Sequence, residues 1–204
     1  MINKQNIAKI KQDAGQALIV AATKSRGIEQ IKAIKQQGLC IVGENRVQEL
    51  LAKYEVIDGL KWHFIGNLQT NKVRYIVDKV AMIQSVDRQN LAIEIDKQCQ
   101  KIGVIMPVLI EVNIGEEAKG GVSIEGLAEL LDFVKQQNNL ALKGLMFIPP
   151  IDAKEETYKQ IKEIFDKHKD KFGLEYLSCG MSGDYEMALE HGANMIRPGT
   201  ILFE

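Results

Sequence analysis

A lysine stands at the end of the first apolar run of the chain. Lys24 follows LIVAAT and precedes SRG, so it lies where a buried strand would give way to a loop. The neutral amine of a lysine is a nucleophile that condenses with an aldehyde to form an imine. A single lysine at a strand end is more often an ordinary solvated residue, so this feature is informative only together with others.

Two short turns rich in small residues lie near the end of the chain, in the segments CGMSGD (179–184) and RPGT (197–200). Their glycines allow a ligand to approach the backbone closely, and Ser182 and Thr200 add hydroxyl groups, which is typical of phosphate sites. Ser182 is also placed to cap a helix that begins near Asp184. Since ordinary turns use the same residue types, both interpretations stand at this point.

Three further polar residues are associated with apolar runs. Arg197 follows Ile196, and its guanidinium needs a partner there, either a buried carboxylate or an acceptor on a ligand. Asn45, with Gln48 three residues later, resembles a helix cap and could face a ligand as well. His63 in WHFIG is expected to be a residue of the core or its rim.

The order of the secondary structure decides whether these residues meet. Eight apolar runs alternate with segments of helical period, which is the pattern of repeated βα units. Continuous runs such as VIMPVLIEV predict strands that are buried on both faces of a parallel sheet. The predicted strands are Leu18–Lys24, Leu39–Asn45, Trp62–Gly66, Val80–Val86, Val104–Asn113, Ala141–Ile148, Tyr176–Gly180 and Asn194–Thr200.

An amphipathic helix is predicted ahead of the first strand, over Ile2–Ala14. In a closed barrel the first and eighth strands are neighbours, so this helix can cover the gap after the last strand. We therefore expect one α/β domain over residues 1–204, a TIM-type (β/α)8 barrel. The carboxyl ends of barrel strands form the working face, where Lys24 would emerge one strand away from a phosphate held by the two turns.

Composition excludes several classes of partner. The 204 residues are 46% hydrophobic and 26% charged with a formal net charge of −1, and the interspersed charges favour a small ligand over nucleic acid or an anionic membrane. The chain has neither a signal-peptide core nor eighteen consecutive apolar residues, so we expect a cytoplasmic protein. Cys40, Cys99 and Cys179 lack CxxC spacing and nearby histidines, so we expect three small buried residues without disulfides or zinc.

Five ordered motifs resemble those of the YggS/PROSC-type pyridoxal phosphate (PLP) homeostasis proteins. They are GEN-x-VQE (43–49), WHFIG-x-LQ-x-NK (62–72), GLM-x-IP (144–149), LS-x-GMS-x-D (177–184) and R-x-GT (197–200). The resemblance implies a barrel like the N-terminal domain of alanine racemase, with PLP bound as an imine on Lys24. It also implies that Ser182, Gly199 and Thr200 hold the phosphate, that Arg197 faces the pyridine nitrogen, and that Asn45 lies near the ring.

The chain departs from the family pattern at two places close to this site. The usual segment VSKTKP is replaced by ATKSRG, and Pro198 stands in R-x-GT where an aliphatic residue is common. Both changes leave the lysine and the phosphate residues in place. They alter the loop after Lys24 and the backbone donors next to Pro198.

The resemblance predicts a carrier of PLP rather than a catalyst. A permanently charged Arg197 disfavours protonation of the pyridine nitrogen, which makes the ring a weak electron sink. Racemisation also needs acid and base groups on both faces of the substrate, and we expect no second domain to complement Lys24. We therefore predict a monomeric PLP carrier or buffer that supplies apo-enzymes, with little or no turnover.

Two alternatives stay open. The first is an amino-acid racemase-like PLP enzyme whose second acid or base comes from within the barrel, with His63 or a tyrosine as the nearest candidate. The second is a PLP-free barrel that binds a sugar phosphate on the same turns, without a covalent lysine.

Overall fold

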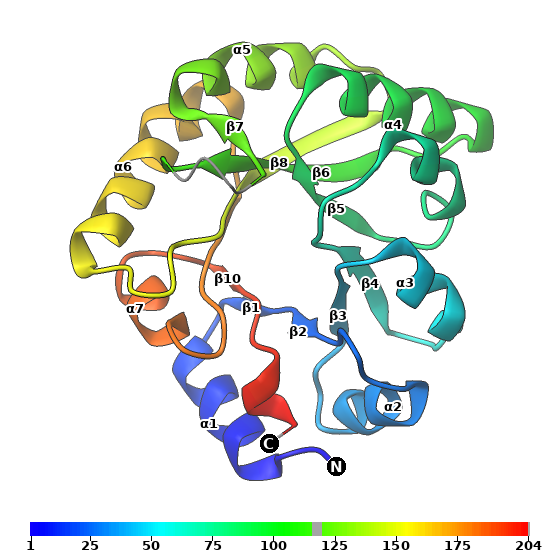
Figure 1. Cartoon of the computed structure of the whole chain (residues 1–204), viewed down its shortest axis with the longest axis vertical. Coiled ribbons are helices and arrows are strands. Elements are labelled where there is room, and N and C mark those ends of the chain that lie inside the picture. Colours follow the sequence, from blue (N-terminus) through cyan, green and yellow to red (C-terminus); the bar gives the residue numbers. More distant parts are fainter. Residues whose placement is uncertain (116–119, 204) are drawn as a thin grey trace.

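The computed structural model describes residues 1–115 and 120–203 and shows a ring of parallel strands surrounded by helices (Figure 1). Each predicted apolar run overlaps a strand, and the first run contains two. The strands of the ring are β1 (Leu18–Ile19), β2 (Ala21–Ala22), β3 (Ile41–Glu44), β4 (Lys61–Phe64), β5 (Met82–Val86), β6 (Met106–Asn113), β8 (Leu140–Phe147), β9 (Tyr176–Ser178) and β10 (Met195–Ile196).

The first apolar run closes the ring because it pairs on both sides. The order of neighbouring strands is β1-β10-β9-β8-β6-β5-β4-β3-β2, and every pair is parallel. β1 pairs with β10 and β2 pairs with β3, while Val20 between them donates its N–H to the carbonyl oxygen of Ile196 at 2.9 Å. The expected closed barrel is therefore confirmed. A short strand, β7 (Val122–Ser123), which pairs only with β6, was not predicted.

Helical segments lie outside the ring in Figure 1 and connect successive strands. They are α2 (Ile28–Gln36), α3 (Val47–Lys53), the 3₁₀ helix η1 (Thr70–Tyr75), α4 (Gln89–Ile102), α5 (Ile124–Lys135), α6 (Glu155–Phe172) and α7 (Tyr185–Glu190), with the 3₁₀ helix η2 (Thr200–Leu202) after β10. In the described part of the chain, no helix has the length and apolarity needed to cross a membrane.

The predicted N-terminal helix is present as α1 (Lys4–Ala14) and begins two residues later than expected. The side chain of Asn3 accepts a hydrogen bond from the N–H of Asn6 at 3.0 Å, and this cap defines the start of the helix. Asn6 in turn donates its side-chain amide to the carbonyl oxygen of Ile201 in η2 at 3.0 Å. The helix thus packs beside the end of the chain, as the barrel topology requires.

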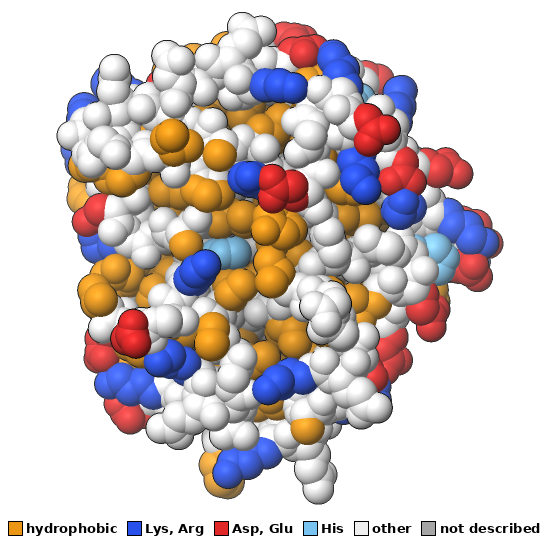
Figure 2. Space-filling view, turned by 180° about the vertical axis from the view of Figure 1, so that it is seen from behind, with side chains coloured by type: hydrophobic (Ala, Val, Ile, Leu, Met, Phe, Trp, Pro, Cys, Tyr) orange, Lys and Arg blue, Asp and Glu red, His pale blue; other side chains and the backbone are white. Residues whose placement is uncertain are grey.

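Two apolar layers stabilise the barrel. The larger one fills the space between the strands and the surrounding helices. The smaller one draws its side chains from six regions around the ring and therefore lies inside it: Val20, Ile65, Met82, Leu109, Met146 and Met195. Alternate residues of a strand point to opposite faces, so each strand contributes to both layers. Figure 2 shows the end of the barrel that faces away in Figure 1, where hydrophobic side chains gather across the middle and most charged side chains lie toward the edge.

The cysteines depart partly from expectation. Cys99 and Cys179 are buried, and burial raises their thiol pKa values to about 11 and about 12. Cys40 is exposed, so the expectation that all three are buried was wrong for this residue. It stands immediately before β3, where the strand has not yet entered the core. All three thiols are free.

Candidate functional site

A cavity of about 240 Å³ opens at the carboxyl ends of the strands. All six residues that the sequence analysis assigned to ligand binding line it: Lys24, Asn45, Ser182, Arg197, Gly199 and Thr200. Ala22, Ile65, Ile148, Met181 and Gly183 complete the lining, and sequence reasoning had not assigned them to the site. Residues that are up to 178 positions apart in the sequence, Ala22 and Thr200, are therefore brought to one place by the barrel.

The two small-residue turns are joined by hydrogen bonds through Ser182. Its hydroxyl oxygen accepts from the N–H of Gly199 at 2.9 Å and from that of Ile201 at 3.4 Å, which leaves the hydroxyl hydrogen free to be donated elsewhere. Ser182 therefore does not cap α7, contrary to expectation. The N-cap of α7 is Asp184, and its carboxylate accepts from the N–H of Met181 at 2.6 Å.

Arg197 lies at the inner wall of the cavity and is only 4% exposed. Nη1 donates to the hydroxyl oxygen of Ser178 at 2.7 Å, and Nη2 donates to the carbonyl oxygen of Phe147 at 2.8 Å. Burial lowers the pKa of the guanidinium, and the nearby Glu111 opposes that shift. Among the described residues no carboxylate is ion-paired with Arg197, and its partners there are the Ser178 hydroxyl and the Phe147 carbonyl oxygen.

A directed chain of hydrogen bonds runs from Arg197 into the barrel interior. Because a guanidinium only donates, the Ser178 hydroxyl accepts from it and donates to Oε1 of Gln84 at 2.7 Å. The Gln84 amide nitrogen then lies 2.9 Å from Nδ1 of His63, which accepts when the imidazole is neutral. Burial lowers the pKa of His63 to about 4, and the charge of Lys61 adds to this shift. The chain of contacts is therefore complete at neutral pH.

Glu111 on β6 is a further ionisable residue inside the barrel and is 7% exposed. Burial raises its pKa to about 7, the charge of Asp87 adds to the rise, and Arg197 opposes it. Its carboxyl group is therefore partly protonated at neutral pH. This residue does not line the cavity, but its negative charge raises the pKa of Arg197.

Lys24 lies at the rim of the cavity and is exposed. Two residues before it, the N–H of Ala22 donates to the carbonyl oxygen of Pro198 at 2.8 Å, which sets the lysine segment beside the RPGT turn. This is the adjacency that the strand order predicted. The replacement of the family proline by Gly27 coincides with the N-cap of α2, so α2 begins directly after the lysine loop.

Asn45 follows β3 at the mouth of the cavity. It was expected to cap the next helix, but the N-cap of α3 is Arg46 and no side chain caps it. The glycine of WHFIG explains how the chain fits here, because a Cβ on Gly66 would lie 2.1 Å from the carbonyl oxygen of Asn45. Only a residue without a side chain allows the end of β4 to pass so close to Asn45.

Fold and site together define a parallel (β/α) barrel with a cavity between a lysine that follows β2 and two small-residue turns that follow β9 and β10. Residues 3–204 match the family of the alanine racemase N-terminal domain. A protein of Aquifex aeolicus named pyridoxal phosphate homeostasis protein is 43% identical over 98% of this chain and 93% of its own length. A protein of Helicobacter pylori with the same name is 37% identical over 91% of this chain and 86% of its own.

Solved structures of related proteins have the same fold as this chain. PipY of Synechococcus elongatus, determined with PLP bound, superposes with a TM-score of 0.90 at 28% identity, over 98% of this chain and 99% of its own. The alanine racemase of Corynebacterium glutamicum superposes with a TM-score of 0.79 at 14% identity over 98% of this chain and 59% of its own, a likeness of fold alone. The chain belongs to the alanine racemase N-terminal domain family and, within it, to the pyridoxal phosphate homeostasis proteins.

Proposed function

We propose that this protein binds PLP in the cavity at the carboxyl ends of its strands and acts in PLP homeostasis as a carrier or buffer. One observation carries the proposal: an exposed lysine, two hydroxyl-bearing turns and a buried arginine, which has no ion-paired carboxylate among the described residues, line a single cavity of about 240 Å³. The relatives named above as PLP homeostasis proteins, and PipY with PLP bound, support the choice of ligand.

Each part of PLP has a complementary group in the cavity. Lys24 would hold the aldehyde group, with which a neutral lysine amine can condense to an imine and one water molecule. The phosphate meets the hydroxyls of Ser182 and Thr200 and the exposed backbone at Gly183, with Gly199 allowing close approach. Arg197 would face the pyridine nitrogen, since two of its five donors are bound to Ser178 and Phe147 and the others are available. Asn45 lines the cavity and would lie near the ring.

The surroundings of Lys24 favour a carrier over a racemase-like enzyme. PLP supplies an electron sink when its pyridine nitrogen is protonated, and a fixed guanidinium beside that nitrogen disfavours this protonation. Racemisation also requires a second acid or base, yet the described residues that line the cavity include no His, Tyr, Asp, Glu or Cys. His63, the candidate from sequence, is buried in the barrel and bound to Gln84 instead.

Deuterium exchange separates the carrier from the enzyme. The PLP-loaded protein is incubated with single amino acids in deuterated water, and α-proton exchange is followed by NMR with the Lys24→Ala variant as control. The carrier account predicts exchange no faster than with free PLP. Exchange at enzymatic rates that is lost in Lys24→Ala would establish the racemase-like alternative, and absence of an imine absorbance band would favour the barrel that binds a sugar phosphate. Transfer of the cofactor to an added apo-enzyme tests the carrier role.

We further propose that the protein works as a cytoplasmic monomer. The lack of a membrane-crossing helix in the described residues is compatible with this, and the near-neutral net charge of −1 is compatible with a small-molecule ligand. Sedimentation at several concentrations, with and without PLP, would show a single species of 22.8 kDa, whereas a concentration-dependent increase in mass would contradict the proposal.

A further inference from the structure

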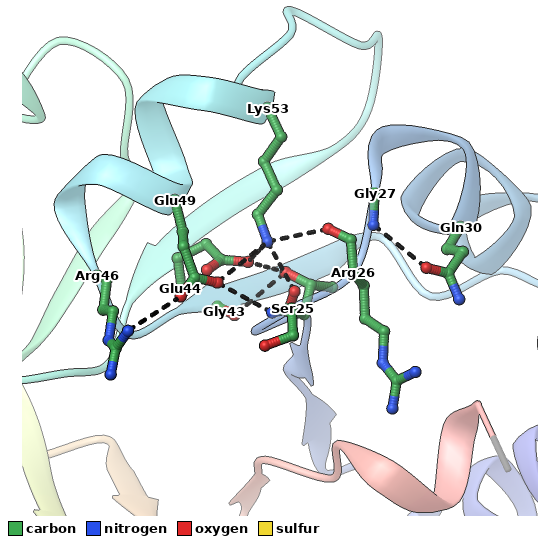
Figure 3. A network of polar contacts seen from close by, with 10 residues as sticks. Ser25, Arg26, Gly27, Gln30, Gly43, Glu44, Arg46, Glu49 and Lys53 are labelled. Atoms are coloured by element: carbon green, nitrogen blue, oxygen red, sulfur yellow. Dashed lines mark hydrogen bonds and ion pairs between the residues drawn. The ribbon is translucent and has the colours of Figure 1, made fainter.

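The loop that carries Lys24 is attached to the outside of the barrel by an ionic cluster on β3 and α3 (Figure 3). Thr23, directly before the lysine, is fully buried, and its N–H donates to the carbonyl oxygen of Gly43 at 2.9 Å. Its hydroxyl also donates to the carboxylate of Glu44. The residue before Lys24 is therefore fixed by β3.

The residue after Lys24 has a constrained backbone. Ser25 has a φ of +60° and is the one non-glycine residue in the described ranges with a positive φ. Such a conformation is disfavoured for a residue with a side chain and persists when the surroundings hold it. The N–H of Ser25 donates to Oε2 of Glu49 on α3 at 2.9 Å, so an external acceptor holds the backbone at this point.

Lys53, at the end of α3, bridges the two sides of the loop. Its Nζ donates to the carbonyl oxygen of Thr23 at 2.7 Å and to that of Arg26 at 3.1 Å, and it lies 2.6 Å from Oε1 of Glu44. The three donors of an ammonium group thus meet three oxygen atoms. Figure 3 shows Lys53 pointing from α3 into this cluster, with Glu44 and Glu49 on one side of its ammonium group and the backbone of Arg26 on the other.

The charges in the cluster depend on one another. Glu44 is fully buried, and burial raises the pKa of its carboxyl group, whereas the bonds from Lys53 and Thr23 lower it. The side chain of Lys53 is only 10% exposed, so each ion needs the other as partner. Burying an ion pair costs desolvation energy. Here the pair contacts the loop at Thr23 and at the backbone on both sides of Lys24.

We propose that Glu44, Glu49 and Lys53 form a positioning cluster, which holds the backbone on both sides of Lys24 so that its amine reaches the cavity and captures an aldehyde efficiently. The inference rests on the proposed role of Lys24 as the attachment residue. The three residues do not line the cavity and act through the loop. Noncovalent binding of a phosphate-bearing ligand is then independent of the cluster, whereas covalent capture depends on it.

Two variants separate positioning from general destabilisation. Glu49→Ala removes the acceptor of the Ser25 N–H from a side chain that is 30% exposed, and the double variant Glu44→Gln/Lys53→Met removes the buried ion pair without leaving one charge unpaired. The matched control is Lys143→Met, which removes a surface ion pair with Glu175 on the opposite end of the barrel strands.

Three readouts are compared in these proteins. The first is the rate of imine formation after addition of PLP to cofactor-free protein, followed by absorbance. The second is the affinity for pyridoxine 5′-phosphate, which carries the phosphate and ring but an alcohol in place of the aldehyde. The third is the rate of trypsin cleavage after Lys24 and Arg26, measured without any ligand. We expect both variants to form the imine at least fivefold more slowly and to be cleaved at least fivefold faster, with unchanged affinity for pyridoxine 5′-phosphate and an unchanged control.

The inference is overturned by wild-type rates of imine formation in either folded variant, whatever the trypsin result. It is also overturned if affinity for pyridoxine 5′-phosphate falls in parallel, because that would indicate a general effect on the site. If the wild-type protein itself forms no imine, the proposed function fails. In that case trypsin still tests the cluster by itself: cleavage of the variants at the wild-type rate would refute the attachment of the loop. Failure of the proposed function and failure of the positioning cluster are therefore distinguishable.

Discussion

Glu111 makes the stability of this protein depend on pH in a way that one substitution removes. Its pKa is raised from 4.5 to about 7 in the folded protein, chiefly by burial. The unfolded chain therefore releases the proton more readily, and folding becomes less favourable as pH rises from 4.5 through 7. A shift of one pKa unit corresponds to about 1.36 kcal/mol. The loss of folding stability that Glu111 causes is therefore about 2.5 kcal/mol larger at pH 8 than at pH 5.

The Glu111→Gln variant keeps the size of the side chain and removes the ionisation. Urea unfolding of both proteins at pH 5, 6, 7 and 8 gives the free energy of unfolding at each pH. We expect the difference between variant and wild type to shift in favour of the variant by about 2.5 kcal/mol across this range. Glu163→Gln, on the exposed face of α6, serves as control and should follow the wild type. Parallel profiles for Glu111→Gln and wild type would refute the raised pKa and the placement of Glu111 inside the barrel.

Three further predictions concern the interior, the phosphate turn and strand packing. His63 has a pKa of about 4 when folded and 6.5 when exposed, so its own contribution to the free energy of unfolding falls by about 2 kcal/mol between pH 7 and pH 4.5; in urea titrations the difference between His63→Gln and wild type should shift in favour of the variant by this amount as the pH is lowered. Thr200→Ala should weaken PLP binding by roughly 1–3 kcal/mol in equilibrium dialysis and leave binding of unphosphorylated pyridoxal unchanged; equal losses for both ligands would move the phosphate elsewhere. Gly144→Ala places a Cβ 1.9 Å from the carbonyl oxygen of Tyr176 and should lower the free energy of unfolding by more than about 3 kcal/mol, whereas Gly183→Ala meets nothing within 4 Å and should change it by less than about 0.5 kcal/mol.

The fold was predictable because its determinants are periodic. Apolar runs of β-branched residues separated by helical segments leave few arrangements, and the N-terminal helix favoured closure of the barrel. Boundaries were less predictable. The run Val104–Asn113 begins as a strand only at Met106, and β7 has two residues and one partner strand, too short for any periodic signal. The split of the first run at Val20 follows from tertiary pairing, which no local pattern encodes.

The cavity residues were predictable from strand order and family motifs, whereas the groups that support them were not. Lys53 and Glu49 have the ordinary spacing of charged residues on an exposed helix, and nothing in that spacing indicates that they bind a loop twenty or more residues earlier. A signal did exist for two buried acids. Glu44 in IVGE and Glu111 in VLIEV interrupt apolar runs, and a carboxylate in a strand buried on both faces requires a partner or a raised pKa.

The caps predicted for Ser182 and Asn45 failed for a common reason. Serine and asparagine both cap helices well. Ser182 and Asn45, however, lie where barrel strands end, and there the backbone of a neighbouring segment either bonds to the side chain or packs against the residue. Ser182 accepts from two N–H groups of the last turn, and Asn45 lies against Gly66. Local helix signals were overridden where the strand ends converge on the cavity.

The attachment of PLP to Lys24 is tested most directly by trapping the imine. The protein is loaded with PLP, reduced with borohydride, digested, and its peptides are analysed by mass spectrometry, with Lys24→Ala treated in parallel. The account predicts that the reduced cofactor is found on the peptide containing Lys24, that the yellow colour is bleached, and that Lys24→Ala carries no label. Labelling of a different lysine, or no labelling of a protein that retains PLP, would contradict it.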